Sequence, residues 1–325
     1  MAATGLEGVV AFETEIAEPD REGSALRYRG VDIEDLVGVR PFEEVWGLLV
    51  DAEPLQWRDA SSKARTRREL QAALARIDSP PLLDLTDDEA REELANASAL
   101  AISLVAGGAA GEGGTLAERF ISASRGEADP EAARALDAYW VTTAEHGMNA
   151  STFTARVVAS TGADAPTALS AAIGALSGPL HGGAPERVLK MLDEVEREGD
   201  ATRYVRRLLD RKERLMGFGH RIYRAEDPRA RVLHRTAIEL GTPRLELAEE
   251  LERVALQELS ARSPDRVLAT NVEYWAAVVL DRAGLTPDLF TPLFACARMG
   301  GWSAHILEQK RTGRLIRPTA RYIGD

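Results

Sequence analysis

Signals for the start and the apolar face of α-helices recur along most of this chain, and they limit what it can fold into. Residues 86–89 have the capping-box pattern, in which Thr86 and Glu89 cap each other's backbone N–H groups. Asp129-Pro130 combines a helix cap with a proline at the first helical position. Apolar side chains at i, i+3, i+4 and i+7 over 188–195 form one helix face. Long β-branched runs are few, so the sequence predicts a mainly α fold.

The strand signals are confined to the N-terminal region. Val9–Ile16 and Ala25–Tyr28 flank a turn-like segment at 19–23, which predicts a short β-hairpin. The Gly-rich segment 107–114 is typical of a flexible connector. The small residues at 165–177 favour either a buried helix or a subunit contact. The signals above predict one helix from Thr86 to about Val105, one that begins at Asp129-Pro130, and one that includes 188–195 and ends near Gly199. Further helices are expected over 61–76, 152–161, 165–176, 201–215, 229–240, 243–261, 271–283 and 288–311.

Length, charge and cysteine content narrow the class of protein. The 325 residues suggest about two domains, and the single cysteine excludes a disulfide framework. The net charge of −12 argues against nucleic-acid binding. Eleven basic and four acidic residues between Arg203 and Arg235 give that segment +7, so the rest carries −19. No apolar run is long enough for a membrane span and no signal peptide is recognisable, so we expect a cytoplasmic protein.

Three of the five histidines lie beside glycine, in breaks between helices: His146, His181 and His220. Glycine lets a ligand approach the backbone, and a nearby helix start favours a neutral imidazole that donates a hydrogen bond. A purely structural role is the alternative for each. No pair has metal-ligand spacing, so no metal site is expected. His234 is expected on a solvated helix face and His305 at a structural helix position.

Several arginines are candidates for binding carboxylates or phosphates. Arg229 follows Asp227-Pro228 and would lie in the first turn of a helix, where its fork could bind a carboxylate at two points. Arg298 lies mid-helix near Phe294, and Arg317 lies on a C-terminal extended arm. A surface ion pair is the alternative for each.

Taken together, the motifs of this chain resemble those of the citrate synthase family over nearly its whole length. The resemblance rests on segments 5–9, 26–33, 146–152 (His-Gly-Met-Asn-Ala-Ser-Thr), 178–184 (Gly-Pro-Leu-His-Gly-Gly-Ala), 217–221 (Gly-Phe-Gly-His-Arg), 227–230 (Asp-Pro-Arg-Ala), 301–305 (Gly-Trp-Ser-Ala-His) and Glu308-Gln309. Four of these motifs occur in the family's order and near its spacing.

The resemblance implies a two-domain helical fold with a short N-terminal β-hairpin, in a homodimer that closes over a cleft. The large domain would comprise 1–182 and 281–325, and the small domain 183–280. The implied reaction of the tricarboxylic acid cycle is condensation of acetyl-CoA with oxaloacetate, followed by hydrolysis of citryl-CoA to citrate and CoA. Acetyl-CoA is then a substrate, no cofactor is required, and neither nucleic acid nor membrane is a partner.

The family's functional residues map onto matching positions of this chain. His181 would donate a hydrogen bond to the enolate of acetyl-CoA, and His220 would polarise the oxaloacetate carbonyl. Arg224 would contact a CoA phosphate, and Phe294 would line the site. Oxaloacetate would be held by His146, Arg229 and Arg298. The partner subunit's Arg317 would complete this binding site.

The catalytic base differs from the family pattern. Where the family commonly has Asn-Val-Asp, this chain has Asn271-Val272-Glu273. Glu273 is one methylene longer, and a competent base there requires an adjusted backbone. Two alternatives stay open: a 2-methylcitrate synthase that uses propionyl-CoA, and a weakly active or non-catalytic homologue that binds CoA or a dicarboxylate.

Overall fold

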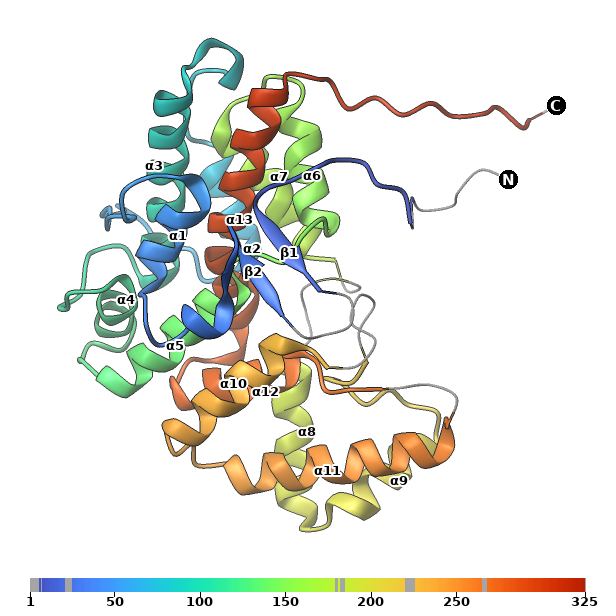
Figure 1. The fold of residues 1–325 in the computed structure, drawn as a ribbon. Helices are drawn as coiled ribbons and strands as arrows, with labels where there is room; N and C mark the ends of the chain where they lie inside the picture. The colour runs from blue at the N-terminus through green and yellow to red at the C-terminus, as the bar shows by residue number, and fades with distance from the viewer. Residues whose placement is uncertain are drawn as a thin grey trace.

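The computed structural model describes residues 6, 8–20, 25–178, 181, 185–219, 226–264 and 268–324. Helices dominate this part of the chain, as the sequence predicts (Figure 1). The α-helices are α1 (Phe42–Val50), α2 (Arg67–Leu74), α3 (Asp87–Ala106), α4 (Leu116–Arg125), α5 (Pro130–Thr143), α6 (Ala150–Ala159), α7 (Ala165–Leu176), α8 (Pro185–Glu198), α9 (Ala201–Asp210), α10 (Pro228–Glu239), α11 (Leu245–Arg262), α12 (Val272–Arg282) and α13 (Phe290–Thr312). Short 3₁₀ turns are η2 (Ile33–Asp35), η3 (Leu82–Asp84) and η4 (Pro287–Leu289).

A small antiparallel sheet near the N-terminus has the order β1 (Ala17–Pro19), β2 (Leu26–Tyr28) and β3 (Val31–Asp32). The two residues between β2 and β3, Arg29 and Gly30, both have positive φ, which matches the twist of a tight hairpin. The buried Tyr28 hydroxyl lies 3.1 Å from the carbonyl oxygen of Glu145. The sheet is thereby anchored to the segment that joins α5 to α6.

The predicted strand over 9–16 is wrong in position. Residues 9–14 have no strand partner, and the first strand begins at Ala17. Instead, the Thr14 hydroxyl and the Glu15 backbone N–H donate to Glu308 at the end of α13. The apolar residues at 9–12 gave a strand signal, but no neighbouring strand takes up their backbone groups.

Among the helix starts that the structure describes, three have a complete capping box, and the sequence prediction recognised one of them. Thr86 accepts from the Glu89 N–H at the start of α3, as predicted. The same pattern begins α2 and α4. The predicted helix over 61–76 starts only at Arg67, and α1 and α4 were not predicted. Segment 107–114 connects α3 to α4, which confirms the expected connector.

Helix α13 forms the centre of the larger group of helices. It packs against α1, α3, α5, α6 and α7, and most of its residues are buried on all sides. The small-residue helix α7 packs on α6 and α2, so it is a buried helix within the chain. Among the described residues, no helix is long and apolar enough to cross a membrane.

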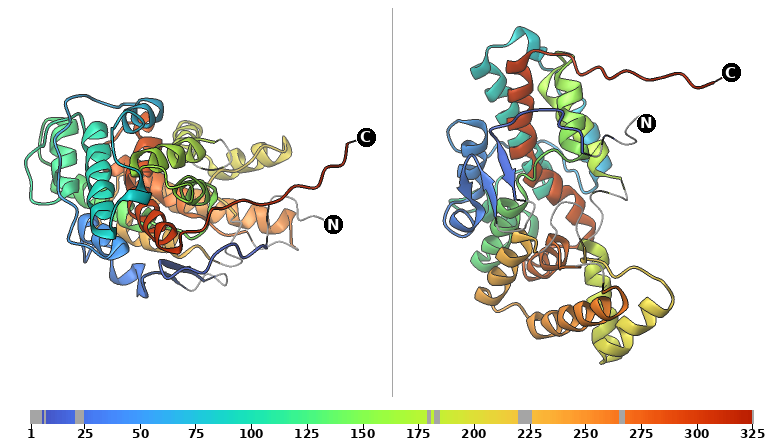
Figure 2. Two further views of the ribbon diagram at one scale, coloured as in Figure 1. Left: turned by 90° about the horizontal axis from the view of Figure 1, so that it is seen from above. Right: turned by 45° about the vertical axis from the view of Figure 1, so that its right-hand side comes forward.

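Helices α8–α12 gather at the other end of the molecule (Figures 1 and 2). α12 packs against both α8 and α10, and α11 packs against α9. This group meets the larger one where α10 and α12 contact α5. Residues 313–324 form an arm that extends from the body of the protein, and all of them except the half-buried Ile316 are exposed (Figure 1).

Glu34 in η2 provides a charged link between the N-terminal segment and α10. One carboxylate oxygen accepts from Arg231 Nε at 2.7 Å, and the other accepts from Arg235 Nη1. Partial burial alone would raise the pKa of Glu34, but these two arginines lower it below its usual value.

Glu34→Gln should therefore lower the free energy of unfolding at pH 7 by about 1 kcal/mol, since the three side chains are partly exposed. A carboxyl group whose pKa is lowered in the folded state contributes its full stabilisation above about pH 4.5, its pKa in the unfolded chain. This contribution is lost as the pH falls through the folded-state pKa. Urea unfolding at pH 7 and pH 3.5 should show the difference shrinking at the lower pH. Glu92→Gln, at an exposed position of α3, is the control, and a pH-independent difference would contradict the assignment.

Candidate functional site

The first part of the site is the segment that joins α5 to α6. His146 lies in this turn and is almost fully buried, and Gly147 beside it has a φ of 62°. Asn149 then caps α6 by accepting from the backbone N–H groups of Ser151 and Thr152. This cap fixes the start of α6 directly after the histidine.

His181 contacts the capped start of α6. The Ser151 backbone N–H donates to His181 Nε2 at 3.3 Å, and the Ser151 hydroxyl lies 3.0 Å from the same nitrogen. Because a backbone N–H can only donate, Nε2 is the unprotonated nitrogen and the ring proton lies on Nδ1. Burial and the positive charge of Arg298 lower the pKa of His181 to about 4. His181 is therefore a neutral imidazole at pH 7.

Arg298 places a positive charge inside the protein, in the middle of α13. It is 3% exposed, and its guanidinium lies 5.0 Å from the centre of the half-buried Phe294 ring, one turn earlier. Within the described part of the chain, its Nε and Nη1 atoms have no hydrogen-bond partner. Burial lowers the pKa of Arg298, and the negative charge of Glu145 opposes that shift. A buried guanidinium with open donors is suited to receive a carboxylate.

Arg229 lies in the first turn of α10 and is also buried. Its side chain forms a fork with Asp227, from Nε at 3.0 Å and from Nη2 at 2.9 Å. The predicted cap and N1 proline at Asp227-Pro228 are confirmed, because Asp227 also accepts from the Arg229 backbone N–H. The charges of Arg229 and Arg298 act on each other, which indicates that these two arginines share one region of the interior.

Glu273 lies in the first turn of α12, where Asn271 is the cap and accepts from the Glu273 N–H at 3.0 Å. Asn271 also donates to the carbonyl oxygen of Gly219 at 2.9 Å, which ties α12 to segment 217–219. Burial raises the pKa of Glu273 to about 7, and the positive charge of Arg229 opposes that rise. A carboxylate with a pKa near neutrality can exchange a proton at physiological pH.

The structure thus relates four of the expected site residues through their charges: His181, Arg298, Arg229 and Glu273. His220 and Arg224 lie outside the described residues. Arg317 is exposed on the C-terminal arm, whose neighbouring residue Ile316 donates to the Ser160 hydroxyl. No three His, Cys, Asp or Glu side chains in the described ranges are grouped so that they could hold a metal ion.

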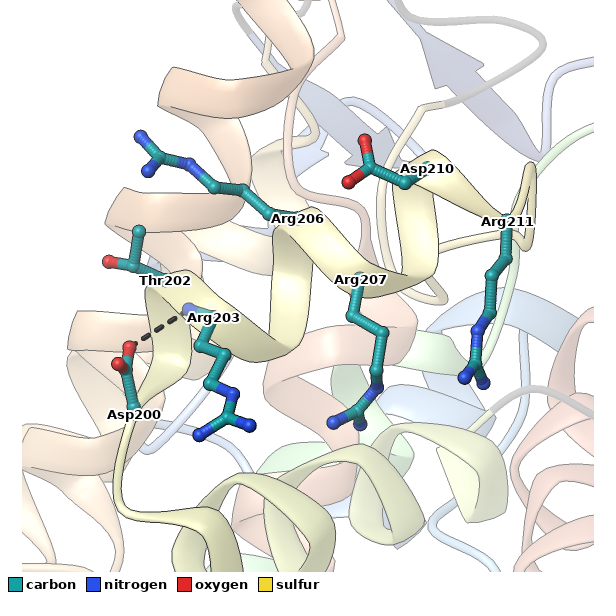
Figure 3. A pocket seen from close by; sticks show the side chains of 7 residues that line it. All are labelled: Asp200, Thr202, Arg203, Arg206, Arg207, Asp210 and Arg211. Atoms are coloured by element: carbon teal, nitrogen blue, oxygen red, sulfur yellow. Dashed lines mark hydrogen bonds between the residues drawn. The ribbon is translucent and has the colours of Figure 1, made fainter.

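Where the structure describes it, at 203–219 and 226–235, the basic segment does not form one open positive surface. A hollow of about 600 Å³ along α9 is lined by Arg203, Arg206, Arg207 and Arg211 together with Asp200, Thr202 and Asp210 (Figure 3). Arg206 pairs with Glu258, and Arg207 pairs with Glu198. Carboxylates from other helices therefore neutralise part of the excess charge.

Two histidines outside the site, His234 and His305, contact other side chains. His234 was expected on a solvated face, but its ring stacks on Trp275 at 4.0 Å and its Nε2 lies 2.8 Å from Glu249. His305 is fully buried between Glu145 and Arg156. The His234 side chain is 32% exposed, so Trp275 covers this face only in part.

Three residues that contribute to the site were not singled out from the sequence as functional. Ser151 orients His181, Glu145 balances the charge of Arg298, and Asp227 holds Arg229. The Asp-Pro cap was a visible signal for Asp227. Nothing local marks Ser151 or Glu145, since their partners come from distant parts of the chain.

Comparisons with known proteins agree with this arrangement. A family profile described as "Citrate synthase, C-terminal domain" matches residues 5–85 and 84–319. A Mycobacterium tuberculosis protein named "Putative citrate synthase 2" is 57% identical, over 98% of this chain and 92% of its own length. The citrate synthase of Haloferax volcanii is 36% identical, over 99% of this chain and 95% of its own length.

The fold has a solved counterpart that was determined with ligands. It is the ternary complex of carboxymethyl coenzyme A and oxaloacetate with the citrate synthase of Thermoplasma acidophilum. That structure has a TM-score of 0.83 at 26% identity, and the match covers 99% of this chain and 96% of that one. The profile match and the full-length relatives show that this chain belongs to the citrate synthase family.

Proposed function

We propose that the protein condenses acetyl-CoA with oxaloacetate and hydrolyses the resulting citryl-CoA to citrate and CoA. The observation that carries this proposal is the combination of a neutral His181, a buried Arg298 with open donors, and a Glu273 carboxyl whose pKa is raised to about 7. The reaction needs a base for a methyl proton, a donor for an enolate oxygen and cations for a dicarboxylate. These described side chains supply all three.

In the first step, the Glu273 carboxylate removes a proton from the methyl group of the thioester. The Nδ1–H of His181 donates a hydrogen bond to the oxygen that becomes the enolate oxygen. The enolate carbon then attacks the ketone carbon of oxaloacetate, and the ketone oxygen becomes an alkoxide. This alkoxide takes up one proton, which balances the proton removed by Glu273, and citryl-CoA is formed. Water finally cleaves the thioester, which releases citrate and the CoA thiol.

Oxaloacetate would bind through His146, Arg229 and Arg298. The family pattern adds His220 for the ketone oxygen and Arg224 for a CoA phosphate, and both stay predictions. We assign no cofactor and no metal, because proton transfer and electrostatic stabilisation suffice for this chemistry. The ternary complex of the Thermoplasma relative with a CoA analogue and oxaloacetate supports the two substrates.

The assembly completes the proposal. We assign 1–182 and 281–325 to the large domain and 183–280 to the small one, because α8–α12 pack mainly on one another. A homodimer would let the exposed arm deliver Arg317 to the partner's site. A role in the tricarboxylic acid cycle and a cytoplasmic location are part of the same proposal.

A 2-methylcitrate synthase is the second candidate. A Shewanella oneidensis relative with that name is 32% identical over all of this chain and 95% of its own length. One extra methylene on the thioester changes discrimination by only ~1–3 kcal/mol. The ratio of kcat/KM for acetyl-CoA and propionyl-CoA with oxaloacetate decides between them. A higher value for propionyl-CoA would select the second candidate.

Glu273→Gln should abolish thiol release from acetyl-CoA in the presence of oxaloacetate, because an amide cannot accept the methyl proton. Wild-type kcat should rise with pH through about 7, as the carboxylate ionises. Glu273→Asp should retain turnover lowered by about 10²-fold, because its carboxylate is displaced by about a bond length.

Thermal unfolding separates this loss of activity from loss of fold. The charged form of Glu273 is disfavoured by burial, so the Gln variant should be at least as stable as wild type. Glu92→Gln is the matched control and should keep full activity. Turnover in Glu273→Gln would overturn the base assignment, and oxaloacetate or CoA binding by wild type without thiol release would favour the non-catalytic homologue.

Hybrid dimers test the position of Arg317. Arg317→Ala and Glu273→Gln should each be inactive alone, because each lacks one part of every site. Co-refolding them in equal amounts should restore about a quarter of the wild-type sites, since half of the dimers are mixed and each has one complete site. No recovery, in mixtures shown to contain mixed dimers, would contradict a contribution across subunits.

A further inference from the structure

Asp227 receives more hydrogen bonds than its place at the start of α10 requires. It is 1% exposed. Its Oδ1 accepts from the backbone N–H of Arg229 at 3.1 Å and from Arg229 Nε at 3.0 Å. Its Oδ2 accepts from Arg229 Nη2 at 2.9 Å and from the backbone N–H of Val272 at 2.9 Å. One carboxylate thus satisfies four donors from two different helices.

The bond to Val272 is the unusual one. A capping side chain ordinarily bonds only to the N2 or N3 backbone N–H of its own helix. Val272 is the first residue of α12, so Asp227 joins the N-termini of α10 and α12. Asp129 offers a direct comparison: it caps α5 ahead of Pro130, accepts from Ala132 N–H at 3.0 Å and pairs with Arg125 at 3.1 Å. Both of its partners lie within four residues of it along the chain.

The two ends of this bridge lie next to the two halves of the proposed chemistry. Arg229, assigned to oxaloacetate, has three of its N–H groups on Asp227. Glu273, assigned as the base, is the residue after Val272. A shift of Asp227 would therefore move the substrate-binding arginine and the base relative to each other, and a misplacement of about 1 Å can lower a rate by about 10²-fold.

Asp227 also acts on Glu273 through its charge. Burial has the largest effect on Glu273 and raises its pKa. The positive charge of Arg229 lowers this pKa, and the negative charge of Asp227 raises it. From the other elements, Arg214 before segment 217–219 and Arg187 on α8 lower this pKa. On α5, the phenol of Tyr139 interacts with the same carboxyl.

We infer that Asp227 is a positioning residue for the condensation: it holds Arg229 and Glu273 at a fixed separation by bonding to both helix N-termini. This inference rests on the proposed roles of Arg229 and Glu273. Asp227 itself does not need to touch either substrate.

Asp227→Asn is the first test. The asparagine amide has no charge, and it replaces one of the two accepting oxygens by an NH₂ group that faces the N–H donors of Arg229 and Val272. The starts of α10 and α12 therefore lose their common acceptor. We expect KM for oxaloacetate to rise and kcat to fall, with kcat/KM lowered by about 10²-fold. We also expect the rise of kcat with pH to move to lower pH, because a negative charge beside Glu273 is lost.

Asp129→Asn is the matched control, since it removes the same kind of cap and ion pair at an Asp-Pro sequence away from the site. It should lower thermal stability and leave KM, kcat and the pH profile as in wild type. If Asp227→Asn behaves in the same way, Asp227 is only structural and the inference is overturned.

Val272→Pro tests the bridge without changing any charge, and it covers the case in which Asp227→Asn does not fold. Proline is well tolerated at the first position of a helix, and Asn271 before it already has the extended backbone that proline requires, with ψ 171°. The one hydrogen bond lost is that to Asp227 Oδ2, and the proline ring replaces the buried valine side chain. We expect kcat to fall more than KM rises, with the pH profile unchanged, and an unaltered kcat would overturn the inference.

These outcomes are distinct from failure of the proposed function. Wild-type protein that releases no thiol, or Glu273→Gln that keeps turnover, would refute the function or the base. Active wild type with an inactive Glu273→Gln, together with wild-type kinetics in Asp227→Asn and Val272→Pro, would refute only the bridge.

Discussion

The site depends on a positive charge in the protein interior that has no hydrogen-bonded counterion among the described residues. Arg298 lies on α13, the helix around which the larger group packs, and two of its nitrogen atoms have no partner among the described residues. A buried charge of this kind lowers the free energy of unfolding. The compensation is long-range: Glu145, fully buried beside His146, acts on Arg298 through its charge.

Helix N-termini position the other side chains of the site. The start of α6 gives the N–H that fixes the tautomer of His181, and the starts of α10 and α12 place Arg229 and Glu273. Because α6 belongs to one group of helices and α10 and α12 to the other, the relative position of the two groups sets the separation of these side chains. Contacts of α5 with α10 and α12 are where the groups meet.

Much of this fold could be predicted locally, and the failures have identifiable causes. The capping patterns at Thr66 and Thr115 were as readable as the one at Thr86. Helix α1 was not readable, because Pro41 provides no side-chain cap and the Phe42 N–H is instead bonded to Asp137 of α5 at 2.8 Å. The position of β1 likewise depends on its pairing with β2 rather than on residues 9–12.

For the site, the residue types were easier to predict than their protonation states and hydrogen-bond partners. The neutrality of His181 was expected from a helix start just after it, whereas the N–H that contacts it belongs to α6, thirty residues earlier. Burial and Arg298 also contribute, and both are tertiary effects. The raised pKa of Glu273 and the bridge by Asp227 have the same origin, since each requires α10 and α12 to be side by side.

We propose that Arg298 is buried at a cost in stability because it binds a substrate carboxylate. Arg298→Met, which preserves much of the volume and removes the charge, tests it by two measurements on one protein: urea unfolding and calorimetric titration with oxaloacetate. We expect the variant to be at least as stable as wild type and to bind oxaloacetate about 10²-fold more weakly, because a charge-assisted pair is lost. A variant that binds oxaloacetate as tightly as wild type would contradict it.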